Sequence, residues 1–306
     1  MSLAVGARSG EHCDFAGAFD AHRAAFKTGA AARFDEGRKA DADQLAVLAP
    51  LRALAQELHA RGASVLLVGR DDAALSATAA ALGGRGATVQ TCVADLATES
   101  GRGKVLLDAR AFGGRGCNVL INNAGIGDFG MVDAMDDAAI ERLFAINAIA
   151  PIQLTRALLA HLRAQPEAAI LNVGSVFGSL GYPGFATYSA TKFALRGFSE
   201  ALRRELADTR IGVHYFAPRA TRTGMNASAV ESMNVELGVA MDTPAHVAAA
   251  ACNLLERGRR NAVFGWPEKL FVRINALAPG IVDGSLRKQL PIIRRHAAAA
   301  LAARQS

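Results

Sequence analysis

Cysteine is scarce in this 306-residue chain, and its four cysteines lie far apart. Cys13, Cys92, Cys117 and Cys252 show none of the short paired spacings typical of zinc sites and disulfide-rich domains. Cys92 and Cys117 lie in or beside apolar runs, where a thiol behaves as a small buried hydrophobe. The pattern predicts buried free thiols, with neither a disulfide nor a metal centre.

Long apolar runs and targeting patterns are also lacking. Hydrophobic residues make up 51% of the chain, yet every apolar run looks too short or too interrupted to span a bilayer. The N-terminus has no basic-then-apolar signal pattern, and Glu11, Asp14 and Asp20 argue against an organellar transit peptide. We therefore expect a cytoplasmic protein, long enough to form one large α/β domain with a substantial core.

Positive charge is unevenly distributed. The net charge is +6, while residues 256–306 alone carry ten Lys or Arg against three acids, so the rest of the chain is close to neutral. The same stretch carries spaced apolar residues, among them Leu270, Phe271 and Ile293. Such a tail can pack on its own domain or on a neighbouring subunit, touch an anionic membrane surface, or bind nucleic acid. The apolar content favours packing, with weak membrane-surface contact as the alternative and no nucleic-acid partner.

Strand-like and helix-like stretches alternate along the centre of the chain. Short apolar runs at residues 64–68, 88–93, 118–121, 169–174, 212–216 and 262–264 are separated by helical patterns, one of which starts at Thr243-Pro244. This alternation predicts an α/β fold, a Rossmann-like doubly wound parallel sheet in a single domain. We expect an atypical N-terminal segment over 1–43 that could be disordered, the sheet domain over 44–266, and basic amphipathic helices over 267–306.

Three side chains of suitable chemistry are spaced as a proton-transfer site requires. Tyr188 and Lys192 are four residues apart and share one face of a helix, with β-carbons about 5–6 Å apart. An ammonium beside a phenol favours the phenolate, so we expect the pKa of Tyr188 to lie below its usual ~10. Such a phenol can exchange a proton with a carbonyl or alcohol oxygen. Ser175 follows a buried run and could bind the same oxygen. Alone, the Tyr-x3-Lys pair is common by chance and favours an ordinary exposed helical contact.

Other motifs in the chain give this pair a context. Asn122-Asn123-Ala124-Gly125 follows an apolar run, Asp95-Leu96 follows another, and Asn147 lies in a long helical pattern over 136–163. With Ser175 and Tyr188-x3-Lys192, in this order, these motifs resemble the short-chain dehydrogenase/reductase family. The resemblance extends from about Arg52 to Trp266 and rests on the combination, since each motif alone is common.

The resemblance implies a role for each reactive residue. Tyr188 would be the general acid/base, and Lys192 would lower its pKa and bind the nicotinamide ribose. Ser175 would orient the substrate oxygen. Asn147 would hold a water that connects Lys192 to solvent, so that protons can leave. The reaction implied is NADP(H)-dependent interconversion of a carbonyl and a secondary alcohol. The surrounding apolar residues, Phe177 and Met233 among them, suggest a hydrophobic small-molecule substrate.

The cofactor preference follows from the residue after the second strand of this fold. Arginine there suits a 2′-phosphate, whereas an acid selects a free 2′-hydroxyl. The chain has Arg70 at that point, so the resemblance implies NADP(H) over NAD(H). Arg219 stands where the family has glycine after Pro218, so the resemblance does not determine the conformation of the turn at that point. The cofactor-binding residues implied are Arg70, Asp95, Leu96, Asn123, Ala124, Gly125, Tyr188, Lys192, Pro218 and Thr223.

One element of the family pattern is absent. The family begins with a strand and a Thr-Gly-x3-Gly-x-Gly turn, whose backbone amides hold the cofactor diphosphate. Here residues 45–51, directly before the first helical pattern, contain no glycine, and Thr28-Gly29-Ala30 imitates only the start of the motif. Either residues before about Leu51 are not the ancestral reading frame, or the chain has lost tight cofactor binding. The second account allows a non-catalytic binding or scaffold protein. The family also leads us to expect a homodimer or homotetramer.

Overall fold

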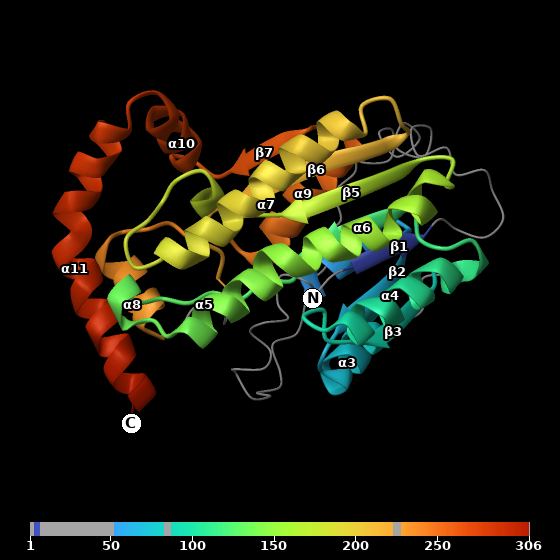
Figure 1. Ribbon diagram of the computed structural model, residues 1–306, viewed down its shortest axis with the longest axis horizontal. Coiled ribbons are helices and arrows are strands. Elements are labelled where there is room, and N and C mark those ends of the chain that lie inside the picture. The colour runs from blue at the N-terminus through green and yellow to red at the C-terminus, as the bar shows by residue number, and fades with distance from the viewer. Residues whose placement is uncertain (1–2, 7–51, 83–86, 223–227, 306) are drawn as a thin grey trace.

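The computed structural model describes residues 3–6, 52–82, 87–222 and 228–305. Within these residues the strands form one sheet in the order β3-β2-β1-β4-β5-β6-β7 (Figure 1). The strands are β1 (Leu3–Gly6), β2 (Ser64–Gly69), β3 (Val89–Val93), β4 (Val119–Asn122), β5 (Ala168–Val173), β6 (Ile211–Pro218) and β7 (Asn261–Phe264). All neighbouring pairs except those of β1 are parallel, which confirms the predicted doubly wound sheet.

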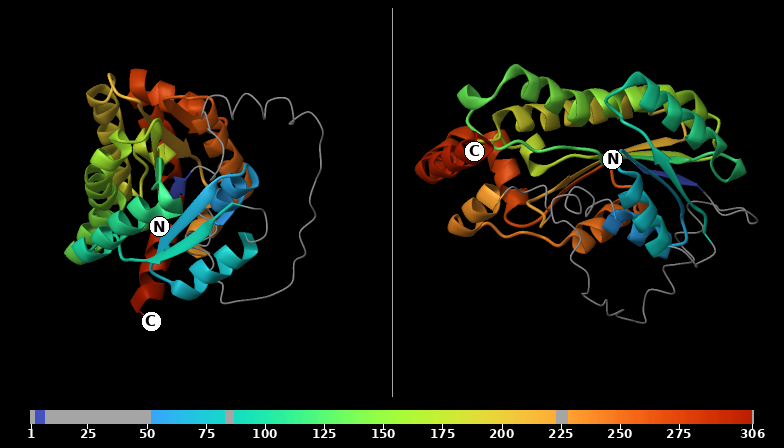
Figure 2. Two further views of the ribbon diagram at one scale, coloured as in Figure 1. Left: turned by 90° about the vertical axis from the view of Figure 1, so that its right-hand side faces the viewer. Right: turned by 90° about the horizontal axis from the view of Figure 1, so that it is seen from below.

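Helices cover both faces of this sheet, as Figure 2 shows. One face carries α4 (Glu99–Ala111), α6 (Ala150–Arg163) and α7 (Ala186–Glu205). The other carries the helix over residues 52–60, α3 (Asp72–Leu82) and α9 (Pro244–Glu256). Side chains alternate across each strand, so neighbours such as Leu66 and Leu67 enter opposite cores. This two-sided burial explains why the strands appear in the sequence as uninterrupted apolar runs.

The central strand β1 is a departure from the expected topology. Leu3–Gly6 pairs antiparallel with both β2 and β4, with Leu3 opposite Leu67 and Ile121. Without it, two inner strands would present unpaired backbone groups to each other, so a short apolar segment is stabilised there in either direction. The sequence showed no regular pattern in this part of the chain, so the strand was not foreseen. Residues 7–51, with Thr28 and Cys13, lie outside the described residues.

The long helical pattern over 136–163 is one continuous helical stretch with an irregular centre. It runs through α5 (Asp137–Phe144), the π-helical η3 (Ala145–Ile149) and α6. Its length and composition would allow it to cross a membrane, contrary to the expectation that no run could. In the structure it covers the sheet, and Leu154, Leu158 and Leu162 are fully buried in the core.

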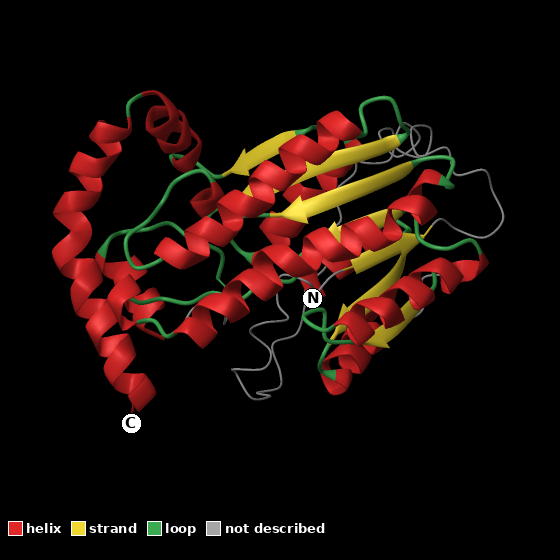
Figure 3. Cartoon of the chain, in the orientation of Figure 1, coloured by secondary structure: helices red, strands yellow, loops and turns green. Residues whose placement is uncertain are grey.

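Two helices follow the sheet at its carboxyl end. α10 (Glu268–Leu277) and α11 (Pro279–Gln305) form the side of the molecule toward which the arrowheads of β5 and β7 point (Figure 3). α11 packs on α8 (Ser228–Glu236), where Ile293 and Ala297 share a buried apolar cluster with Met233. The basic tail therefore folds back on its own domain in this single chain.

Three of the cysteines lie within the described residues. Cys92, Cys117 and Cys252 are buried and unpaired, as predicted for Cys92 and Cys117. Burial raises the pKa of each thiol to about 12, so all three remain protonated and unreactive at neutral pH.

Candidate active site

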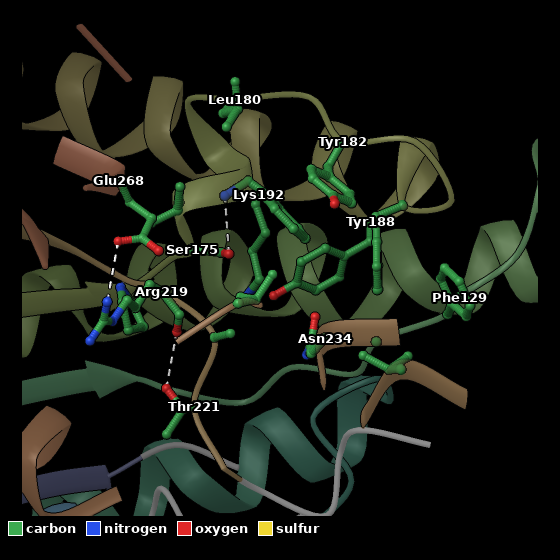
Figure 4. Close-up of a pocket in the computed structure, with 18 of the residues that line it drawn as sticks. Phe129, Ser175, Leu180, Tyr182, Tyr188, Lys192, Arg219, Thr221, Asn234 and Glu268 are labelled. Atoms are coloured by element: carbon green, nitrogen blue, oxygen red, sulfur yellow. Dashed lines mark hydrogen bonds and ion pairs between the residues drawn. The ribbon is translucent and has the colours of Figure 1, made fainter. Parts of the chain in front are cut away.

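The carboxyl ends of β4, β5 and β6 deliver three predicted residues to one cavity. Asn123, Ser175 and Pro218 each follow or end one of these strands and line a cavity of about 840 Å³ (Figure 4). Tyr188 and Lys192 reach the same cavity from the first turns of α7. The parallel sheet brings these residues together because its strand ends meet at one edge.

Ser175 is held by the turn that follows β5. It is the N-terminal cap of the short helix η4 (Val176–Gly178), and its hydroxyl oxygen accepts a hydrogen bond from the Phe177 N–H at 3.1 Å. A second hydrogen bond joins Ser175 to the phenol of Tyr188 and favours the phenolate. The cap bond therefore holds the Ser175 side chain at the cavity that Tyr188 also lines.

The pKa of Tyr188 differs from the sequence-based prediction. Burial raises it to about 12, and the hydrogen bond with Ser175 offsets this only in part. The Lys192 ammonium lies 5.7 Å from the centre of the tyrosine ring, and its Nζ donates to the Val173 carbonyl at 3.4 Å. Helical spacing placed the two side chains together but could not show that the amine faces a backbone carbonyl. The expected lowering was wrong for this structure, and Tyr188 is a protonated phenol at neutral pH.

Lys192 is itself strongly affected by its surroundings. Its side chain is 4% exposed, and burial lowers its pKa from 10.5 to about 8. Near neutral pH the group is still mostly charged, although its charge is held in a poorly solvated place. A buried lysine at the wall of a cavity is a frequent mark of a functional site.

Asn147 lies at the π-helical turn, 0% exposed. Its side-chain oxygen accepts from the Ile126 N–H at 2.8 Å, and its amide donates to the Ile126 carbonyl at 2.9 Å and to Thr191 Oγ1 at 3.1 Å. The side chain thus ties the loop after β4 to α7. Pro151 has no N–H and cannot donate an α-helical bond to the Asn147 carbonyl four residues earlier.

Gly125 is confined by the same two functional side chains. A β-carbon at this position would lie 3.2 Å from Lys192 Nζ and 3.3 Å from Asn147 Oδ1. These distances are tighter than ordinary van der Waals contact, so a side chain here would displace the lysine or the asparagine. The close approach of the Lys192 and Asn147 side chains thus explains the glycine of Asn123-Ala124-Gly125.

The remaining predicted cofactor residues lie along the same edge or outside the described residues. Arg70 is exposed directly after β2. Asp95 follows β3 and accepts from the Ala97 N–H at 2.9 Å, while Leu96 is buried. Thr223 falls in the stretch 223–227 that the structure does not describe.

Arg219 has a structural task that the sequence did not reveal. Its guanidinium donates to both carboxylate oxygens of Asp242 at 2.8 and 2.9 Å, and to the Trp266 carbonyl at 2.8 Å. Glu268 Oε2 lies 3.5 Å away (Figure 4). This bidentate pair is largely buried, and it lowers the pKa of Asp242. The arginine therefore fixes the turn after β6 against α10, where the family pattern has glycine.

The far wall of the cavity is apolar and aromatic. Phe177 stacks on Tyr182 with ring centres 5.0 Å apart, and Phe185 meets Tyr188 edge-on at 6.1 Å. The segments over residues 176–185 and 228–234 both contribute to this lining, including Phe177 and Met233. Sequence reasoning missed the contribution of α11, which supplies Val282, Leu286 and Gln289 to the wall. Gln289 accepts a hydrogen bond from the Tyr182 hydroxyl at 2.9 Å.

A buried amide network between the sheet and two helices was also missed. Asn122 donates to Asn172 Oδ1 at 2.8 Å and to Thr155 at 3.1 Å, and Asn172 donates to Ser199 at 2.8 Å. The two asparagines face each other across β4 and β5. They hold α6 and α7 in place on the sheet, because a buried amide left without partners is costly. A polar residue inside an apolar run was the only available signal.

Comparison with known proteins agrees with this geometry. The family described as short chain dehydrogenase matches residues 52–234, from the first described helix to α8. This chain belongs to the short-chain dehydrogenase family. It is an oxidoreductase by that membership.

Named relatives extend the likeness across most of the fold. Nodulation protein G of Rhizobium meliloti (strain 1021) is 32% identical over 213 residues, which cover 66% of this chain and 83% of that protein. A short-chain dehydrogenase from Sphingobium yanoikuyae in complex with NADPH is 28% identical, with a TM-score of 0.63 over 77% of this chain and 90% of its own. The bulky-bulky ketone specific alcohol dehydrogenase from Comamonas testosteroni is 25% identical, with a TM-score of 0.62 over 76% and 88%.

The described residues fit the two ends of a nicotinamide dinucleotide better than its middle. Tyr188, Lys192 and Asn123 line the cavity, and Arg70 stands exposed directly after β2. Between them, a short-chain dehydrogenase uses the carboxyl end of its first strand. Here β1 is antiparallel, so its amino end lies at the carboxyl edge of β2 and β4. No diphosphate-binding turn is found among the described residues.

Proposed function

We propose that the protein is an NADP(H)-dependent oxidoreductase that interconverts a carbonyl and a secondary alcohol on a hydrophobic small molecule. The observation that carries this is the convergence of Ser175, Tyr188 and Lys192 at an apolar cavity of about 840 Å³. The pocket is large enough for a bulky ketone. The NADPH complex and the bulky-ketone enzyme among the similar structures support the same class of reaction.

In this proposal a nicotinamide cofactor, when bound, supplies a hydride to the carbonyl carbon. Tyr188 donates its phenolic proton to the carbonyl oxygen, which suits a group that stays protonated up to about pH 12. Ser175 donates a hydrogen bond to the same oxygen and so fixes it within reach of the phenol. Proton donation of this kind accelerates reactions about 10²–10⁴-fold.

Lys192 and Asn147 support the proton donor in different ways. As Tyr188 gives up its proton, the developing phenolate is stabilised by the Lys192 ammonium, and the tyrosine then regains a proton. Asn147 would hold a water on the route from Lys192 to solvent, and its side-chain bonds keep the helical turn that presents its carbonyl. Lys192 and Tyr188 would also bind the nicotinamide ribose.

The remaining cofactor contacts are proposed along the edge of the sheet. Arg70 would bind the 2′-phosphate of NADP(H), which favours it over NAD(H). The adenine would lie against Asp95 and Leu96, and a ribose against Asn123, Ala124 and Gly125. Pro218 would border the nicotinamide, and the family pattern implies a further cofactor contact from Thr223, which lies outside the described residues.

The test is NADPH oxidation by the full chain with a panel of bulky aromatic and alicyclic ketones. Wild-type protein should consume NADPH faster than NADH, while Tyr188→Phe should be slower by at least a hundredfold. Arg70→Glu should narrow or reverse the preference for NADPH without changing the ketones accepted. If no ketone is reduced by wild type, or if Tyr188→Phe matches it, the proposal fails.

A second candidate, a non-catalytic binding or scaffold protein, is favoured by the missing diphosphate turn. Each charged hydrogen bond to a diphosphate contributes on the order of 1–3 kcal/mol. Losing two or three would weaken binding about a hundredfold or more. Titration of NADPH against the fluorescence of Trp266, the sole tryptophan, separates the two candidates. Micromolar binding argues for the enzyme, and its absence at millimolar NADPH for the scaffold.

We also expect a homodimer or homotetramer, formed through the helices around Asn147 and Tyr188. Phe193 on α7 is 42% exposed and Ile149 in η3 is 47% exposed on the monomer. Sedimentation equilibrium of wild type and of Phe193→Asp tests this expectation, since the charge should shift the protein toward monomer.

A further inference from the structure

The two C-terminal helices leave a group of large apolar side chains in solvent. Trp266, Leu270, Phe271, Leu277 and Ile281 are 68%, 41%, 43%, 87% and 66% exposed, respectively. They lie on the segment before α10, on α10 itself and on the first turn of α11, and we call them the α10–α11 corner. In Figure 1 these helices form one end of the molecule. Exposed apolar groups of this kind mark a surface that meets a partner.

Basic residues share the faces that carry this apolar corner. Leu270, Arg273 and Leu277 are spaced i, i+3 and i+7 on α10, so they lie along one stripe. Ile281 and Lys288 are seven residues apart on α11 and share a face in the same way. Between residues 266 and 290, all of which the structure describes, the exposed charged residues are four bases and one acid, namely Lys269, Arg273, Asp283, Arg287 and Lys288.

The corner is also the mouth of the cavity. Phe271 and Ile281 line the cavity and are exposed at the same time, so they lie where it opens to solvent. Ile274, Val282 and Leu286 continue the apolar lining inward. An apolar path therefore connects the exposed corner with the chamber that holds Ser175 and Tyr188.

We propose that the α10–α11 corner docks on an anionic lipid bilayer, and that the cavity takes its apolar substrate from that bilayer. The apolar side chains enter the interface between headgroups and acyl chains, and the bases pair with anionic headgroups. A second copy of the chain fits less well. A two-fold contact would bring two copies of this mostly basic surface together, each with four exposed bases and one acid, and like charges repel. Docking itself does not depend on the proposed activity, whereas substrate entry rests on it.

Sedimentation of the full chain with vesicles tests the docking. Vesicles of phosphatidylcholine with about a third phosphatidylserine should sediment the protein, pure phosphatidylcholine much less, and salt should release it. Trp266 reports insertion directly, since its emission should shift to the blue on the anionic vesicles. Leu277→Asp combined with Ile281→Asp should weaken binding at least tenfold. Both positions are largely exposed, so the fold should tolerate the change.

Matched variants at the other end of the molecule serve as controls. Leu107 is 67% exposed on α4, and Leu107→Asp should bind vesicles as wild type does. Arg273→Glu should reduce anionic binding by roughly fivefold or more per charge removed, from about 1 kcal/mol per basic residue near the surface. Arg163→Glu, at an exposed position on α6, should have no such effect.

Three outcomes overturn the proposal: no sedimentation with anionic vesicles, equal binding by wild type and the Leu277→Asp, Ile281→Asp variant, or dissociation of a dimer by that variant without vesicle binding. The last outcome would make the corner a contact between copies. Because binding is measured without cofactor, vesicle binding without NADPH oxidation contradicts only the proposed function. NADPH oxidation without vesicle binding contradicts only the docking.

Discussion

Replacing Lys192 by methionine should stabilise the fold while removing activity. The lysine is 4% exposed, and its pKa falls from 10.5 to about 8 on burial. At about 1.4 kcal/mol per tenfold change, this corresponds to roughly 3 kcal/mol of instability at pH 7. Methionine fills similar volume without a charge, and it loses the 3.4 Å bond to the Val173 carbonyl and the contact of the ammonium with the Tyr188 ring. We therefore expect Lys192→Met to raise the free energy of unfolding by about 1–3 kcal/mol at pH 7.

The predicted difference in the free energy of unfolding depends on pH, and the pKa shift of Lys192 determines its direction. The folded pKa of Lys192 lies below the unfolded one, so between about pH 8 and 10.5 the unfolded chain holds the extra proton. The wild-type protein therefore gains stability as the pH rises through that window, and the variant does not. The difference in the free energy of unfolding between Lys192→Met and wild type should therefore decrease by about 2 kcal/mol from pH 7 to about pH 9.5. Urea unfolding of both proteins at the two pH values measures it.

An exposed lysine provides the control. Lys104 donates to the Val93 carbonyl at 3.0 Å from the surface of α4, so Lys104→Met also loses a bond from an ammonium to a backbone carbonyl. Its effect on stability should be small at both pH values. The reasoning is refuted if wild type is the more stable protein at pH 7, or if the Lys192→Met difference is the same at pH 7 and pH 9.5.

The remaining predictions concern the pH profile, Asn147 and Arg219. For carbonyl reduction, kcat/KM should stay constant near neutral pH and fall above about pH 8, because Lys192 loses its proton there while Tyr188 is still protonated. A profile that stays flat to about pH 10 would contradict the role of the charged Lys192 in the reaction. Asn147→Ala should cost about 2–4 kcal/mol in urea unfolding, since it removes the partner of the part-buried Ile126 N–H and carbonyl, while Thr191 keeps its bond to the Tyr188 carbonyl; a loss below about 0.5 kcal/mol would show that the Ile126 groups find other partners. Arg219→Gly restores the family residue, yet it should destabilise the fold by about 3 kcal/mol because buried Asp242 loses its bidentate partner and keeps only His246, 3.4 Å away; unchanged thermal unfolding would disprove this role of Arg219.

Position along a parallel sheet was the part of the site that sequence could predict. Asn123, Ser175 and Pro218 each come at the end of an apolar run, and parallel strands align their carboxyl ends. The order of these motifs then identified the family, which the match over residues 52–234 confirms. The start of α9 could be predicted from local sequence, because Thr243 caps the helix and Pro244 occupies its first turn.

Other features depend on contacts that spacing does not determine. Tyr188 and Lys192 lie together as predicted, but burial decides the pKa of the phenol, and burial is set by Phe177, Phe185 and the rest of the cavity wall. The amphipathic pattern of α11 showed that one face is buried and not what it is buried against. The four-residue β1 is too short for any periodicity, and its direction depends on tertiary pairing.

Deuterium transfer from NADPH to a ketone tests directly whether the protein reduces a carbonyl with Tyr188 as the proton donor. NADPH carrying deuterium on the reactive carbon of its nicotinamide is incubated with a bulky prochiral ketone and either wild-type protein or Tyr188→Phe, and the alcohol is examined by mass spectrometry. Wild type alone should give an alcohol with one deuterium on the carbinol carbon, in a single stereoisomer, although both proteins should bind NADPH. Unlabelled ketone recovered from both incubations, or equal alcohol from both, would contradict this prediction.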